Sequence, residues 1–268
     1  MSDRIKKLFV FVLSIGFLGW SLLLFPLTAR ADGLSEKHIE EISNLWQKSA
    51  HAFADVNCSS CHLEPETKQL IIAPNHESCQ SCHERQVETF LLGKHGIRLQ
   101  EGLSPLTPAM AHLPMKEAAS DRQMNCNTCH DVHSVNTFTA SVNSCLTCHN
   151  DTHSLNYVKS KHGLLFTEAK LLPAPTADLV SCATCHLPRQ RVEGTKTVFV
   201  NHNNTYNLLP RDRMVKDVCM NCHGMEYSYN SIFDDELVKA NFDAPPTQYL
   251  ETLEMVKAFE KKRGGTED

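Results

Sequence analysis

The sequence lacks the short motifs that usually mark a nucleotide-binding or hydrolytic domain. It contains no glycine-rich phosphate-binding loop and no G-x-S-x-G sequence, so no separate catalytic domain is indicated. It also lacks an excess of positive charge, with 26 basic against 31 acidic residues and a formal charge of −5. Binding to nucleic acid depends mainly on basic residues that contact phosphates, so we expect no nucleic-acid partner.

No cysteine is left over for a disulfide or a catalytic nucleophile, because all 12 cysteines lie in C-x-x-C-H motifs. The cysteines are Cys58, Cys61, Cys79, Cys82, Cys126, Cys129, Cys145, Cys148, Cys182, Cys185, Cys219 and Cys222. The histidines that end the six motifs are His62, His83, His130, His149, His186 and His223. The motifs are unevenly spaced, which is not the fixed period of a solenoid.

Three kinds of site use paired cysteines. A zinc site takes two such pairs to complete a tetrahedron, and a thioredoxin-like site takes one pair near a βαβ unit. Neither requires a histidine directly after every pair. Covalent attachment of haem c does require it, because the two sulfurs join the haem vinyl groups and the histidine binds the iron. The sequence therefore predicts six covalently bound haem c groups with their iron.

The N-terminus has the pattern of an export signal. Basic Arg4, Lys6 and Lys7 precede an apolar run over 8–27, and a small-x-small site ends at Ala31. We expect cleavage after this signal peptide, 1–31; the alternative is an uncleaved membrane anchor. In both cases the remaining chain, 32–268, would lie in the periplasm or outside the cell. Its formal charge would be −8.

About 237 residues for six haems leave too little polypeptide for an ordinary side-chain core. The sequence therefore predicts one hexahaem cytochrome c domain over 32–268, mainly α with extensive loops and little or no β-structure, in which the porphyrins form the core. A helix is predicted over 35–52, with Ser35 as N-cap, and an amphipathic helix near 247–262. Segments 104–115 and 171–180 are predicted loops.

Nine histidines remain for the second axial position of each iron. Six are needed, and we expect them to come from seven candidates: His51, His76, His95, His133, His153, His162 and His202. His38 and His112 fit the pattern less well. His133 and His153 follow a motif histidine by three and four residues. A residue one turn away cannot reach the opposite face of the same iron, so these two should bind a neighbouring haem.

His95 and His162 lie in the matching phrases GKHG and SKHG, about a dozen residues beyond a haem motif. We expect the glycine after each histidine to let the backbone approach a porphyrin. Adjacent haems held in this way would allow rapid electron hopping. The sequence thus predicts metal ligands on both faces of most irons.

Several phrases, including GKHGIRL, CNTCHDVH, CHNDTHSLNYVKSKHG and VSCATCHLPR, resemble the multihaem cytochromes related to hydroxylamine oxidoreductase. The resemblance covers about 50–245. It implies closely packed haems in a mainly helical wrap, mostly bis-histidine ligation, and a role in anaerobic or nitrogen-linked respiration. The enzymes of that group have eight haems, one of them catalytic with a cross-linked tyrosine, whereas this chain has six motifs and no tyrosine that clearly matches.

Three functions follow as alternatives. The first is an exported electron carrier whose partners are other cytochromes, a membrane quinol oxidase or a terminal reductase. The second is a reductase or oxidase that acts on a small nitrogen or sulfur compound at one five-coordinate haem. The third is a subunit of a conducting filament, in which copies of the chain assemble as a homo-oligomer. Membrane contact would go through the N-terminal segment.

Overall fold

The computed structural model describes residues 35–170, 179–237 and 251–263. The predicted export signal at 1–31, residues 171–178 of one predicted loop and the start of the helix predicted near 247–262 lie outside these residues. The chain divides into two units, 1–44 and 45–268. Among the described residues, the first contains most of α2 (Glu36–Trp46), and the cysteine motifs and paired histidines described below belong to the second.

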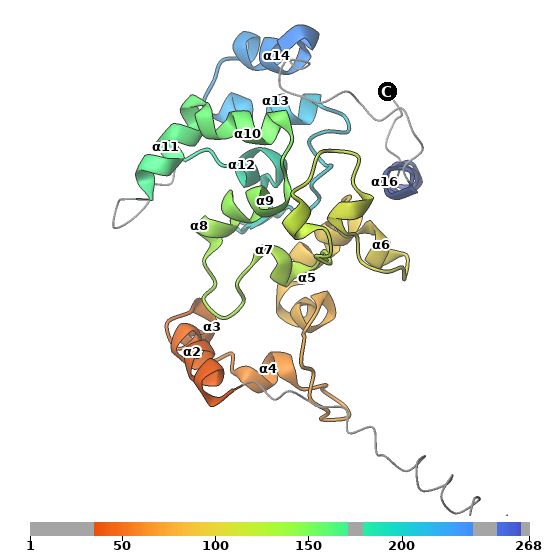
Figure 1. Cartoon of the computed structure of the whole chain (residues 1–268). Helices are drawn as coiled ribbons and strands as arrows, with labels where there is room; N and C mark the ends of the chain where they lie inside the picture. Colours follow the sequence, from red (N-terminus) through yellow and green to blue (C-terminus); the bar gives the residue numbers. More distant parts are fainter. Residues whose placement is uncertain (1–34, 171–178, 238–250, 264–268) are drawn as a thin grey trace, which may run out of the picture. The chain divides into compact units, whose positions relative to one another are not determined.

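Short helices joined by loops build the second unit, as Figure 1 shows. In its N-terminal half, the helices are α3 (Ala50–Phe53), α4 (Cys58–His62), α5 (His76–Leu92), α6 (Ile97–Gln100), η1 (Pro108–Met110), η2 (Glu117–Ala119) and α7 (Cys126–Cys129). The helices that follow are α8 (Thr137–Ala140), α9 (Asn143–Cys148), α10 (Thr152–Lys159), α11 (Lys161–Ala169), α12 (Cys182–His186), α13 (Asp212–Asp217), η3 (Cys219–Asn221), α14 (Met225–Phe233) and α16 (Glu251–Lys262).

The β-structure of the described residues is one two-stranded sheet, β1 (Arg189–Arg191) paired antiparallel with β2 (Val198–Val200). Gln190 lies opposite Phe199 in this hairpin. Two isolated bridges, such as the one between Leu63 and Leu70, add no further strand to the part of the chain that is described. The prediction of a mainly helical fold with extensive loops and little β-structure is therefore confirmed.

The prediction of a single helix over 35–52 was wrong in one respect, because the structure divides this segment into α2 and α3. Ser35 does act as the N-cap, since its Oγ accepts a hydrogen bond from the backbone N–H of His38 at 3.3 Å. The break comes at Ser49, whose side chain caps the new helix by accepting from Ala52 N. A serine that can cap a following helix competes with continuation of the first one.

Buried apolar side chains are small in number and spread over several elements. Val87 of α5, Ile97 of α6, Phe166 of α11 and Val256 of α16 are each at most 2% exposed, and no two share a helix. α16 packs against α6, and its Glu251 accepts a hydrogen bond from Arg98 at 2.7 Å. These side chains support individual contacts between helices rather than one continuous apolar centre.

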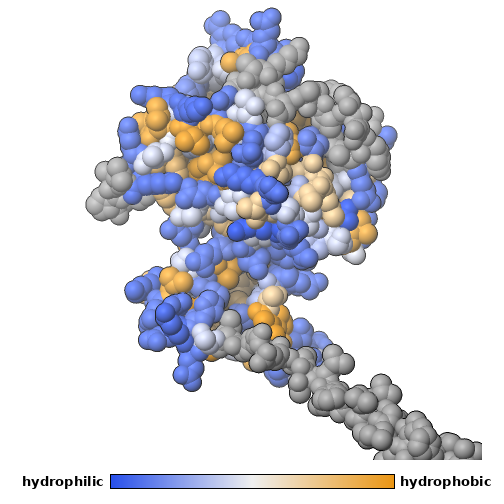
Figure 2. Space-filling model, viewed as in Figure 1, coloured by the Kyte–Doolittle hydropathy of each residue, from blue (hydrophilic) through white to orange (hydrophobic). Residues whose placement is uncertain are grey.

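An exposed apolar patch covers α10 and α11 and is visible in Figure 2. It consists of Leu155 and Val158 on α10 with Leu164 and Leu165 on α11, each 43–51% exposed. The same two helices carry His153 and His162. Among the described residues, no helix is both long and apolar enough to cross a membrane.

Candidate functional site

Every C-x-x-C-H motif forms a turn of helix. The cysteine pairs of five motifs lie in α4, α5, α7, α9 and α12, and η3 contains the first cysteine of the last motif. Helical geometry places the two cysteines, three residues apart, on the same side of the turn. Side chains just before the motifs start several of these helices: Asn57 caps α4, and Asn125 and Ser181 form capping boxes with Thr128 and Thr184. The sequence thus builds the thiol pairs locally.

Each motif histidine faces a second histidine from a distant part of the chain. The pairs, with the distances between ring centroids, are His51–His83 (6.0 Å), His62–His133 (6.3 Å), His95–His149 (6.4 Å), His130–His202 (6.2 Å), His153–His186 (6.1 Å) and His162–His223 (6.1 Å). Six of the seven histidines predicted as second ligands are in these pairs.

The ring separation matches the space that one iron would take between two imidazoles. A ring nitrogen lies about 1.1 Å from its ring centroid, given C–N bonds of about 1.3 Å, and a metal–imidazole bond is about 2.0–2.1 Å long. Two imidazoles on opposite sides of one metal therefore have centroids about 6.3 Å apart. The observed 6.0–6.4 Å agrees with this value, so the residues present fit a haem iron.

Several of these histidines have one ring nitrogen engaged, which leaves the other to face its partner. His62 Nδ1 donates to the carbonyl of Ile71 at 2.8 Å, and His202 Nδ1 donates to that of Val200 at 2.8 Å. His51 Nδ1 donates to the carbonyl of Val132 at 3.3 Å. Such bonds fix the tautomer and the ring direction of a metal-binding histidine.

Burial favours the neutral, metal-binding form of several paired imidazoles. It lowers the pKa of His95 to about 4, with help from nearby His149, and that of His186 to about 4 as well. Burial also lowers the pKa of His130 and His202. A neutral imidazole has a lone pair available for iron, whereas a protonated one does not.

The thiols of different motifs approach one another in the interior. Cys79 and Cys126 lie within hydrogen-bonding reach, and this bond lowers the pKa of Cys79 to about 7. Cys145 and Cys182 are also hydrogen-bonded, which raises the pKa of Cys145. Hence the second motif adjoins the third, and the fourth adjoins the fifth. Among the described residues, no cysteine forms a disulfide.

Backbone and side-chain bonds join neighbouring motifs in the same order. Ser144 Oγ, next to the fourth motif, donates to the carbonyl of Cys129 at 2.6 Å. The backbone N–H of Ala183 in the fifth motif donates to Ser141 at 3.1 Å. The peptide N–H of His202, which faces the third motif, donates to Thr89 Oγ1 at 3.0 Å. Thr89 lies on α5, which carries the second motif.

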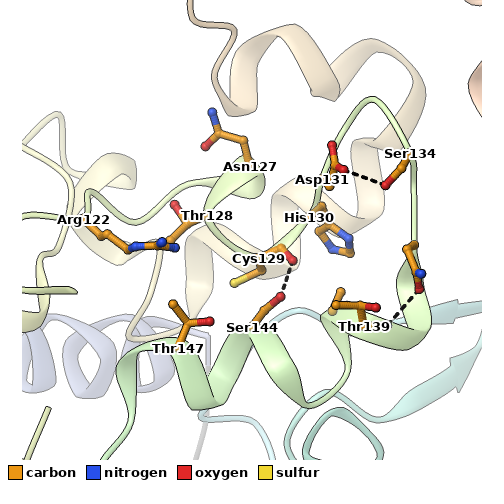
Figure 3. A pocket seen from close by; sticks show the side chains of 12 residues that line it. Arg122, Asn127, Thr128, Cys129, His130, Asp131, Ser134, Thr139, Ser144 and Thr147 are labelled. Carbon is orange, nitrogen blue, oxygen red and sulfur yellow. Dashed lines mark hydrogen bonds between the residues drawn. The ribbon is translucent and has the colours of Figure 1, made fainter. Parts of the chain in front are cut away.

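A polar pocket of about 370 Å³ lies beside the third motif, and Figure 3 shows the ring of His130 directed into it. Arg122 and the hydroxyls of Thr128, Ser144 and Thr147 contribute to its wall. One cation and several hydroxyl groups are suitable partners for a carboxylate. The pocket could therefore accept the propionate groups of a haem.

His76 has no ring contact with a motif histidine among the described residues, and its role as a ligand stays a prediction. It begins α5, and its Nδ1 is buried without a hydrogen-bond partner. His38, outside the predicted ligand set, lies 3.7 Å from Glu41. His112 is exposed.

The glycines after His95 and His162 have a common packing role. A Cβ on Gly96 would collide with the carbonyl of Phe90, and one on Gly163 with the carbonyl of Tyr157. In both places the glycine lets one helix begin tightly against the end of the preceding helix. The matching phrases thus encode a close helix junction, whereas approach of these glycines to a porphyrin stays a prediction.

Two supporting features were missed from the sequence. Asp151 caps α10 and lies 3.4 Å from His149 Nδ1, although it is buried. The segment around His202, VNHNNTYN, contains several buried polar side chains. The backbone N–H of Thr205 donates to Asn203 Oδ1, and Asn207 Nδ2 donates to the carbonyl of Cys185 at 2.8 Å. The sequence signal for this feature was the high number of asparagines in the segment, because asparagine side chains readily form hydrogen bonds to nearby backbone.

Burial raises the pKa of Asp151, but hydrogen bonds from Ser154 and the nearby His149 lower it by more, so that the pKa lies below its usual value. Asp131 directly follows the third motif. A hydrogen bond from Ser134 lowers its pKa, and its side chain is exposed. Both carboxylates are therefore ionised at neutral pH.

Two features occur together here: cysteine pairs on helical turns, and a second histidine that faces the histidine of each motif. This combination is typical of one class of protein, the multihaem c-type cytochromes. The described residues contain no group of three or more histidine, cysteine or acidic side chains placed to hold one ion. The arrangement supplies two nitrogens at a time, which is the number of axial positions on a haem iron.

The comparison with protein families agrees with this class. Residues 50–150 match the family model described as Cytochrome c3, and this segment contains the first four motifs. The match supports a multihaem c-type cytochrome, a class of protein that transfers electrons. No curated protein matches the chain. The resemblance to the hydroxylamine oxidoreductase-related group stays a prediction.

Proposed function

We propose that the chain is an exported hexahaem c-type cytochrome that transfers electrons by hopping between closely spaced haems. The observation that carries the proposal is the pairing of every motif histidine with a second histidine across the space of one iron. Each motif would attach one haem through its two sulfurs. When bound, the haem irons supply one-electron chemistry between the ferric and ferrous states.

The pairing assigns a second ligand to each motif. His133, His51 and His202 would serve the first, second and third motifs. The second ligands of the fourth, fifth and sixth motifs would be His95, His153 and His162. Every pair joins the attachment segment of one haem to a helix or loop that belongs to another, and this cross-linking would hold the haems near one another.

The chain's own bonds support a path that follows the order of the motifs. The segment 130–133 is shared by the first three sites, because His133 faces His62 and the neighbouring Val132 carbonyl accepts from His51. The bond from Ser144 to Cys129 connects the third site with the fourth. The bond from Ala183 to Ser141 connects the fourth with the fifth.

Haems as the interior would also account for the limited apolar core. The patch of Leu155, Val158, Leu164 and Leu165 lies on the helices that carry His153 and His162. A porphyrin offers a broad apolar face, and contact with it would remove such side chains from water. We propose that residues 32–268 form one domain around six porphyrins.

The cellular setting is part of the proposal. The N-terminal signal supports a periplasmic or extracellular place, and the acidic mature chain suits redox partner proteins rather than nucleic acid. The family resemblance favours anaerobic or nitrogen-linked respiration. A catalytic haem would need a motif histidine whose opposite side is open, so the six pairs favour the carrier over a reductase or oxidase.

Mass spectrometry and electron paramagnetic resonance of the exported protein test the proposal together. We expect a mass that exceeds the mature polypeptide by six haem groups, and six low-spin ferric haems that bind no carbon monoxide after reduction. A smaller mass excess would contradict the haem count. One high-spin haem that binds carbon monoxide would favour the enzyme instead.

A further inference from the structure

Asp151 is a buried carboxylate between two histidine pairs. It lies between His149 of the fourth motif and His153 of the fifth pair, and its side chain is only 5% exposed. Its oxygens accept hydrogen bonds from Ser154, from the backbone N–H at 3.0 Å and from the hydroxyl at 2.9 Å. The Oδ2 atom also lies 3.4 Å from His149 Nδ1.

The first consequence concerns position. As the N-cap of α10, Asp151 fixes the start of the helix that presents His153 to His186. Through His149 Nδ1 it also orients the ring that faces His95. One side chain therefore sets the direction of an imidazole on each of two neighbouring haem sites.

The second consequence concerns charge. A ferric haem with two neutral imidazoles carries one more positive charge than the ferrous form, so a nearby negative charge favours the ferric state. A buried charge acts more strongly than an exposed one because water screens it less. A carboxylate close to the far nitrogen of a ligating imidazole also makes that imidazole a stronger donor. Both effects oppose reduction.

We infer that Asp151 is a positioning residue that lowers the reduction potentials of the haems on His149 and His186 relative to the other four. The inference rests on the proposed function, since it concerns haems attached at the fourth and fifth motifs. In the test each ferric iron takes one electron from an external donor, dithionite, and Asp151 itself gains or loses no proton.

Asp151→Asn removes the charge but keeps the shape. Asparagine caps helices as well as aspartate does, and its carbonyl oxygen can still accept from His149 Nδ1. The matched control is Asp131→Asn. Asp131 lies two residues before His133, as Asp151 lies two residues before His153. It accepts hydrogen bonds from the Ser134 hydroxyl at 2.7 Å and from the N–H of His133 at 3.2 Å, but it is exposed.

The measurement is an optical redox titration of the purified six-haem protein. In Asp151→Asn, we expect the part of the curve that corresponds to one or two of six haems to move to higher potential. The Asp131→Asn curve should move less than that of Asp151→Asn, because water screens the exposed charge of Asp131. Asp151→Glu, which keeps the charge but disturbs the cap, should leave the potentials close to those of the wild type.

Superimposable curves for Asp151→Asn and the wild type would overturn the inference, as would an equal shift in Asp131→Asn. If Asp151→Asn does not mature with six haems, Asp151→Ser offers a second uncharged cap. If Asp151→Asn, Asp151→Ser and Asp151→Glu all fail to mature with six haems, Asp151 is only a structural cap and the inference fails. Haem count in the wild type is a separate test: six haems with unmoved potentials would refute this inference and leave the proposed function intact.

Discussion

The imidazole rings of His62 and His133 are almost parallel, with an angle of 6° between their planes, although 71 residues separate them in the sequence. In the pair formed by His153 and His186, the planes are almost perpendicular, at 89°. Two pairs of the same residue type therefore differ in ring orientation. This difference should be visible in the electronic structure of a bound iron.

We predict two distinguishable kinds of low-spin signal in the ferric protein. Two parallel imidazoles interact with the same one of two iron d orbitals, so the energies of these two orbitals differ. Two perpendicular imidazoles each interact with a different orbital, so the two energies stay similar. The His62–His133 site should thus give a rhombic paramagnetic resonance signal, and the His153–His186 site a strongly anisotropic one with a large maximum g value. His153→Ala should remove the second kind of signal and retain the first. A uniform set of six rhombic signals would contradict the ring geometry.

Replacement of His133 by alanine should open one iron. Because His133 faces His62 across the space of one metal, its loss leaves the haem of the first motif with a single protein ligand. We expect about one haem in six to become high-spin and to bind carbon monoxide after reduction, measured by optical difference spectra. The matched control is His112→Ala, since His112 is exposed and lies outside the six pairs. Equal carbon monoxide binding in both variants would show that His133 is not a ligand.

Gly163→Ala should destabilise the junction between α10 and α11. The added Cβ would collide with the carbonyl oxygen of Tyr157, and relief of the collision must move the start of the helix that carries His162. Overpacking of this kind costs about 1–3 kcal/mol. We expect a lower unfolding temperature and partial loss of low-spin character at one haem. Gly224→Ala, where a Cβ would meet nothing within 4 Å, should leave the spin state unchanged.

The polypeptide without haem should not fold. Among the described residues, few apolar side chains are buried, so little apolar surface is removed from water by side chains alone. Circular dichroism of protein made in cells that lack the c-type haem attachment system should show a largely unfolded chain. A cooperative thermal transition in that material would contradict a porphyrin core.

The sequence predicted the mainly helical class and the haem chemistry well because both depend on local patterns. A cysteine pair with its histidine occupies five consecutive residues, and the Asn125 or Ser181 before it caps the turn. The break between α2 and α3 was less visible, because Ser49 can either continue a helix or cap a new one.

Which histidine faces which motif could not be predicted, since each pair depends on the three-dimensional path of the chain. The sequence argument that His133 should bind a neighbouring haem needed only the length of a helical turn. Its partner, His62, required the structure. Asp151 was missed for the same reason, because nothing in the letters HNDTH indicates that the carboxylate is buried.

The long separations within the pairs have a consequence for how the protein is made. In the proposed export from the N-terminus, His51 and His83 would emerge early, so that pair could close first. His62 must wait for His133, and His130 must wait for His202. The haems of the first and third motifs would therefore be completed only by segments exported later, and a truncated export product would carry irons with vacant coordination sites.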